Sequence, residues 1–223
     1  MLTMSVFKWL LRKRQSKGHG VHSPFAFDLI TKVLYSPYSY YAFSDILKEV
    51  GDDPDKGHNQ ISFRLVNHFK PENILEVFPG KGVGSLYILS PSAKISCTVI
   101  ESEVENISYT KEIINGYFHS RDHYSKERDV FFNSSLDEIT FEKFDAIFIN
   151  LDCEDISLYS LERLFELSSE NCFWVINHIN KKLNKQLWRH IVNDARTGIT
   201  FDFKNRTGIA FLRPVYQKEN FSV

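Results

Sequence analysis

The chain has 223 residues and a formal net charge of −1, with 27 Lys and Arg against 28 Asp and Glu. This length fits one α/β domain with an extra segment better than two full domains. The charge balance argues against nucleic acid as a partner, because neutralising phosphates takes an excess of basic side chains. Three cysteines stand far apart, without the spacing of disulfides or of a zinc site, and favour a reducing, cytoplasmic location: Cys97, Cys153 and Cys172.

The N-terminal stretch MLTMSVFKWLLRKRQSKG predicts a short basic amphipathic helix, with a stripe made of Leu2, Val6, Trp9, Leu10 and Lys13. Its positive charges lie within or after the apolar run, unlike those of a signal peptide, and the run is too short for a transmembrane segment. Such a helix packs on its own protein, packs on a second subunit of a homodimer, or lies on an anionic membrane. We expect packing, with the segment 2–27 helping to cover a ligand crevice.

Helical patterns continue up to residue 70. Ser23 is a good N-cap, and Pro24 suits the first position of a helix. Further helices are expected from Ser44 to Gly51 and over 58–69, with a polar turn or linker at 52–57. The chain is therefore divided into an N-terminal helical segment that packs on the core, residues 1–70, and an α/β domain, residues 71–223.

After residue 70, apolar strand patterns alternate with helical ones. Strands are expected at 73–78, 94–101, 128–133, 144–150 and 172–177. The helical patterns between and after them cover 83–89, 104–118, 134–139, 155–168 and 181–195. Two short alternating runs around NRTG close the series as a β-hairpin. This order predicts a doubly wound α/β sheet, parallel except at its last strand.

In such sheets, ligands bind in the crevice beyond the carboxyl ends of the strands. The residues at these ends are Phe78 to Gly80, Glu101, Asn150 to Asp152, and Asn177 to His178. The loop after the first strand, EVFPGKGVGS, holds three glycines, which permit tight turns and the close approach of a ligand. Phe78 occupies its tightest part. Either the loop still cradles a ligand, or the Phe78 ring fills the crevice.

Five segments resemble the class I S-adenosylmethionine-dependent methyltransferases, and more narrowly a group of bacterial O-methyltransferase-like proteins. They are HGVHSPF, YYAFSDI, FRLVNHFKPENILEV, FDAIFIN and RTGIAFLR, spread from about residue 19 to residue 213. The resemblance implies N-terminal helices before a seven-stranded, Rossmann-like sheet that ends in an antiparallel hairpin strand. It also implies a glycine loop that contacts the methionine part of the cofactor, and an acidic residue that binds its ribose.

The resemblance assigns cofactor contacts to residues of the loop and of the strand ends: Glu76, Phe78, Gly80, Gly82, Glu101 and Asn150. Phe78 replaces the first glycine of the family's loop. Glu101 matches the ribose-binding acid, although an acid at a strand end also commonly caps the next helix. Asn150 stands where catechol-type members carry an aspartate.

No metal is expected at the strand ends. Hard cations prefer carboxylate oxygens, whereas Asn150, Asn177 and His178 offer amides and an imidazole. His178 is instead the candidate general base, because an imidazole can take a proton from a hydroxyl near neutral pH. Histidines in this position also serve structure alone.

The resemblance, with no metal expected, implies metal-independent transfer of a methyl group from S-adenosylmethionine to an oxygen of a small molecule. The alternative is a non-catalytic binding or scaffold protein of the same fold, with its cofactor site occluded by Phe78. A nicotinamide-dependent oxidoreductase fits poorly, because the loop lacks the spacing G-x-G-x-x-G from its start.

Overall fold

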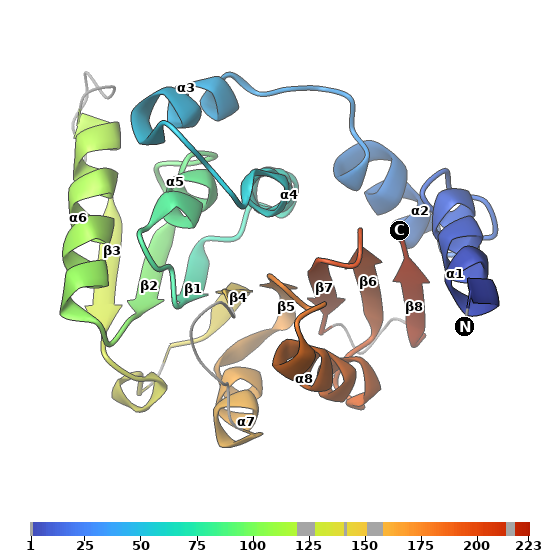
Figure 1. The fold of residues 1–223 in the computed structure, drawn as a ribbon. Coiled ribbons are helices and arrows are strands. Elements are labelled where there is room, and N and C mark those ends of the chain that lie inside the picture. The colour runs from blue at the N-terminus through green and yellow to red at the C-terminus, as the bar shows by residue number, and fades with distance from the viewer. Residues whose placement is uncertain (1, 120–127, 141, 151–157, 213–216) are drawn as a thin grey trace.

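The structure, a computed structural model, describes residues 2–119, 128–140, 142–150, 158–212 and 217–223. Its centre is an eight-stranded sheet in the order β3-β2-β1-β4-β5-β7-β6-β8 (Figure 1). Strand β7 runs antiparallel to β5 and β6, and the other neighbouring pairs are parallel. The strands are β1 Asn73–Val77, β2 Ser96–Ile100, β3 Asp129–Asn133, β4 Phe144–Ile149, β5 Ser168–Ile176, β6 Ile199–Phe203, β7 Thr207–Phe211 and β8 Glu219–Ser222.

Helices cover both faces of the sheet (Figure 1). Helices α2 to α6 and the π-helical turn η1 bury their apolar residues on one face, in a first core. Helices α7 and α8 enclose a second core on the other face. The bounds are α1 Leu2–Gln15, α2 Pro24–Asp28, η1 Leu29–Leu34, α3 Tyr41–Val50, α4 Lys56–Phe69, α5 Val83–Leu89, α6 Val104–His119, η2 Leu136–Glu138, α7 Leu158–Leu167 and α8 Lys182–Asn193. Among the described helices, none combines the length and the apolarity needed to cross a bilayer.

The predicted fold class is confirmed, with one strand more than expected. Strand β8 pairs in parallel with β6 at the edge of the sheet, and its four residues give too short a pattern to detect in the sequence. The predicted cap of α2 is also confirmed, since the Ala26 amide donates to the Ser23 hydroxyl oxygen at 3.3 Å. Helix α3 begins at Tyr41, three residues before Ser44, without a side-chain cap.

The N-terminal helix α1 lies beside β8, at the edge of the sheet (Figure 1). Arg12 forms an ion pair with Asp202 of β6 at 3.3 Å, and the Ser222 amide donates to Gln15 Oε1 at 2.8 Å. The predicted packing of the apolar stripe is wrong for its described members, since Trp9 is 56 % exposed and Leu10 is 47 % exposed. Helical spacing in the sequence shows which residues of α1 share one face, but it does not show which face packs against the protein.

Candidate functional site

A cavity of about 860 Å³ lies beyond the carboxyl ends of β1, β4 and β5. Strand ends and the glycine loop form one wall, and helices α3 to α6 with the loop before α4 form the others. Of the residues that the structure describes, none before Glu49 lines this cavity, so the expected cover by residues 2–27 is wrong. The crevice predicted from the topology is present, however, with Glu76, Asn150 and Asn177 on its wall.

Phe78 adopts a left-handed backbone conformation, with φ of 59°, a region that favours glycine. Its amide donates to the Ile100 carbonyl at 2.9 Å, which continues the ladder past the end of β1. The half-buried ring packs against the second core, and Phe78 is not one of the residues that line the cavity. This packing of Phe78 argues against the alternative in which its ring fills the crevice, on which the occluded-site alternative depends.

The remaining glycines of the loop serve different purposes. A Cβ added at Gly80 would meet no atom within 4 Å, and Gly80 lines the cavity, so backbone is open to a ligand there. A Cβ at Gly82 would come within 2.9 Å of the Thr110 Cα, so Gly82 lets the loop approach α6. The Thr110 hydroxyl also donates to the Gly80 carbonyl at 3.1 Å. The structure thus brings Gly80, but not Gly82, to the cavity.

Glu76, the last but one residue of β1, is a buried acid on the cavity wall. The Ser85 hydroxyl donates to its Oε2 at 2.6 Å. Burial raises the pKa of Glu76 to about 7, and the bond from Ser85 opposes this rise. A Cβ added at Gly84 would lie 3.4 Å from Glu76 Oε1, so glycine there lets α5 pack closely on the carboxylate. A buried carboxylate is destabilised when no opposite charge lies near it. A cationic ligand group would therefore stabilise the ionised form of Glu76.

Glu101 lies at the end of β2, as predicted, but the structure does not bring it to the cavity wall. Its carboxylate accepts from the Glu103 amide at 3.1 Å and from the Asn106 side chain at 3.2 Å. Both donors belong to the start of α6 or the turn before it. Glu101 therefore has the geometry of the helix-capping alternative.

Sequence analysis missed the residues that the loop before α4 contributes. Asp53 Oδ1 accepts from the Asn59 side chain at 2.9 Å and from the Asp55 amide at 3.0 Å. Burial raises the pKa of Asp53, which the neighbouring Tyr87 hydroxyl opposes. His58 also lines the cavity, with Nδ1 at 3.1 Å from the Thr207 hydroxyl. The available signal was the concentration of polar residues in DDPDKG, predicted as a turn or linker, and in His58 and Asn59, which begin the helix predicted over 58–69.

His178 is buried at the end of β5, with φ of 56°. Its Nε2 lies 3.3 Å from Asp55 Oδ1, which Arg206 also contacts. The His178 side chain, helped by Arg206, holds the pKa of Asp55 well below its usual range. Asp55 and Asn177 line the cavity, whereas His178 stands behind them. The predicted base is therefore near the crevice, but its ring faces a carboxylate.

The cavity wall is rich in acidic side chains. Six acids line it against one lysine, Lys81, and they are Glu49, Asp52, Asp53, Asp55, Glu76 and Glu112. Asn150 lines it too, with a buried side-chain oxygen that has no hydrogen-bond partner among the described residues. No group of three or more His, Cys, Asp or Glu in the described ranges is arranged to hold a metal ion. Asp152 and Cys153 lie outside these ranges.

No protein-family model matches the sequence, and no curated protein matches it. Solved structures do match the fold. An O-methyltransferase from Bacillus cereus in complex with S-adenosylhomocysteine (SAH) is 14% identical, with a TM-score of 0.59 over 82% of this chain and 96% of that chain. A Podospora anserina methyltransferase bound to SAH is 14% identical, with a TM-score of 0.59 over 86% and 97%. A putative O-methyltransferase from Klebsiella pneumoniae is 12% identical, with a TM-score of 0.60 over 79% and 92%. At such identities the shared property is the fold, and this chain has the fold of the class I S-adenosylmethionine-dependent methyltransferases.

Proposed function

We propose that the protein binds S-adenosylmethionine in this cavity and transfers its methyl group to an oxygen of a small molecule, without a metal ion. The observation that carries the proposal is the open loop after β1. Glu76 and Gly80 face the cavity, whereas the Phe78 ring packs elsewhere. An occluded, non-catalytic scaffold would require the opposite arrangement.

The cavity wall fits the charges of this cofactor. S-adenosylmethionine carries an ammonium and a sulfonium, and the wall offers a buried carboxyl at Glu76 within an acidic surrounding. In this proposal, Glu76 holds the ammonium and the Gly80 backbone lies along the methionine part. Glu101 is engaged by α6, so the ribose hydroxyls would meet other polar groups of the wall, for which Tyr109 and Glu112 are the candidates.

The bound cofactor supplies an electrophilic methyl group, so the protein's contribution is alignment and the exclusion of water. A general base would accept the proton of the acceptor hydroxyl. We propose His178 for this role because the ionised Asp55 carboxylate orients its ring, although His178 itself does not line the cavity. His58 is the second candidate, because it lines the cavity.

Transfer of radiolabelled methyl from S-adenosylmethionine to a panel of hydroxyl compounds, in the presence of EDTA, tests this function. We expect His178→Ala to lower turnover at least a hundredfold with cofactor affinity nearly unchanged. His58→Ala is the matched comparison, and a larger loss in that variant moves the base to His58. Activity that requires added magnesium would contradict the metal-independent mechanism.

A further inference from the structure

The N-terminal segment concentrates the positive charge of the chain. Residues 1–27 contain five basic side chains and no Asp or Glu: Lys8, Arg12, Lys13, Arg14 and Lys17. Because the whole chain carries −1, this +5 leaves −6 on the rest. With charge distributed so unevenly, the N-terminal segment creates a positive electrostatic potential that attracts negatively charged partners.

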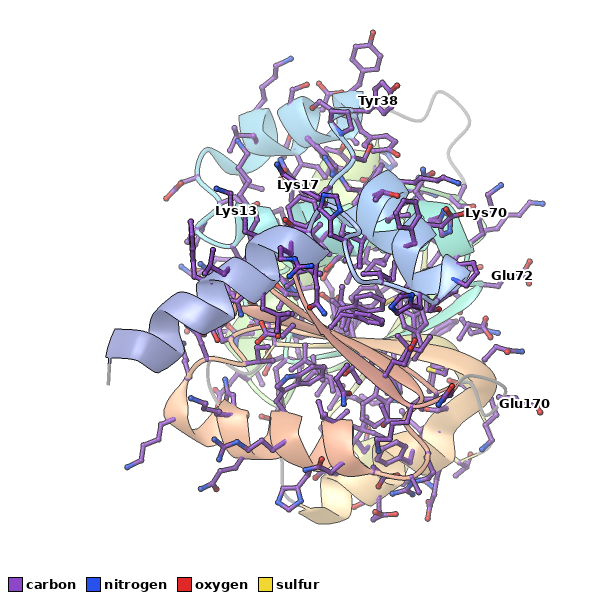
Figure 2. The ribbon with its side chains drawn as sticks, turned by 90° about the vertical axis from the view of Figure 1, so that its right-hand side faces the viewer. Lys13, Lys17, Tyr38, Lys70, Glu72 and Glu170 are labelled. Carbon is purple, nitrogen blue, oxygen red and sulfur yellow. The ribbon has the colours of Figure 1, made fainter. Side chains whose placement is uncertain are left out.

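Helix α1 turns one side to the protein and leaves another uncovered. Arg12 and Gln15 face β6 and β8, as their contacts with Asp202 and Ser222 require. Trp9, by contrast, is 56 % exposed, with the Lys13 ammonium 5.0 Å from the centre of its ring. Figure 2 shows the start of α1 extending beyond the sheet, with Lys13 and Lys17 on the same side of the segment.

Apolar side chains are exposed along the same segment. Leu10 and Leu11 are 47 % and 39 % exposed on α1. Phe27 is 42 % exposed, and its ring lies over the backbone of Gly18, where an added Cβ would be only 2.3 Å away. We call the exposed side chains Trp9, Leu10, Lys13, Lys17 and Phe27 the N-terminal patch. Aromatic and leucine side chains among lysines, in a stretch without acids such as residues 1–27, are typical of segments that lie in a membrane interface.

We propose that the N-terminal patch docks the protein on an anionic phospholipid surface. Trp9, Leu10 and Phe27 would enter the headgroup region, and Lys13 and Lys17 would lie against the lipid phosphates. A second copy of the chain is a poorer occupant, because pairing through the same patch would bring two segments of +5 together. An anionic bilayer complements both the charge and the apolar rings.

Co-sedimentation with vesicles tests the proposal on the full chain. We expect binding to vesicles that contain phosphatidylglycerol, little binding to pure phosphatidylcholine, and release at 1 M salt, where charges are screened. Fluorescence gives a second readout, because Trp174 and Trp188 are buried and Trp9 is exposed. A blue shift on adding anionic vesicles therefore reports on Trp9. Failure to bind anionic vesicles at low salt overturns the proposal.

Variants separate the patch from general charge. Lys13→Glu/Lys17→Glu should lower the partition coefficient onto anionic vesicles at least tenfold. The reason is that each basic side chain near the surface contributes electrostatic attraction to the lipids, and the variant reverses two such charges. Lys48→Glu/Lys94→Glu makes the same change of charge at exposed positions outside the patch and should bind as the natural protein does. Equal losses in both variants would refute docking through α1. Loss of a dimer on Trp9→Ala, seen by sedimentation velocity without any vesicle binding, would assign the patch to a second copy instead.

Discussion

Burial of Glu76 between β1 and α5 raises the pKa of its carboxyl from 4.5 to about 7. The folded state therefore favours the neutral acid. This contribution to stability is fully present below pH 4.5 and is lost as the pH rises through 7. The difference corresponds to about 3 kcal/mol, since one pKa unit equals 1.36 kcal/mol.

We predict that the free energy of unfolding of the ligand-free protein falls between pH 5 and pH 8 by up to about 3 kcal/mol because of Glu76. Glu76→Gln should remove this part of the pH dependence, since an amide does not ionise. Urea unfolding across the pH range measures it. Glu170→Gln, at an exposed position, is the control and should keep the natural slope. If Glu76→Gln keeps the natural slope, the Glu76 carboxyl of the natural protein ionises in the folded state without a cost in stability.

Phe78 is held in a left-handed conformation by the turn and anchored by the second core. In Phe78→Gly the turn loses strain of about 1 kcal/mol, but the ring's packing is lost as well. We predict a net destabilisation of about 1–2 kcal/mol and a cofactor affinity within twofold of the natural value. Thermal unfolding and calorimetry give the two quantities. If Phe78→Gly bound S-adenosylmethionine at least tenfold more tightly than the natural protein, the Phe78 ring would be occluding the cofactor site after all.

At the scale of elements, the sequence predicted helices and strands well where periodicity and caps coincide. The Ser23 cap and the carboxyl ends of β1 and β5, each within one residue of its predicted position, are examples. What an element faces was harder to predict. The apolar stripe of α1 has helical spacing, yet its described members are exposed to solvent. A hydrophobic repeat shows which residues share one face of a helix, but it does not show what that face contacts. Glu101 lies where the resemblance places a residue that binds the ribose, but its carboxylate accepts hydrogen bonds from the start of α6 and the turn before it.

We predict that deleting residues 1–17 lowers the melting temperature by about 2–4 °C. The deletion removes the Arg12–Asp202 ion pair and the Gln15–Ser222 hydrogen bond, together worth about 1 kcal/mol at the edge strand β8. Lys13→Glu/Lys17→Glu keeps both contacts and should melt as the natural protein does. A melting temperature unaffected by the deletion would mean that α1 adds nothing to the fold.

For the molecule as a whole, topology alone predicted where the cavity lies. A doubly wound sheet brings the ends of β1, β4 and β5 together, and the cavity lies there. Nine of the 24 residues that line it come before residue 71, including Asp53, Asp55 and His58, so both predicted segments of the chain contribute to one cavity. The sequence did not predict these nine residues as part of the wall, because pairs such as Asp55 and His178 meet only in three dimensions.

Calorimetric titration with S-adenosylmethionine at pH 6 and pH 8 tests the central claim most directly. Because a cation binds the ionised form of Glu76, and its pKa lies near 7, we predict a micromolar dissociation constant at pH 8 and an affinity about tenfold lower at pH 6. In Glu76→Gln the affinity should be at least tenfold weaker at pH 8 and nearly independent of pH. No binding by the natural protein at millimolar S-adenosylmethionine would contradict the account.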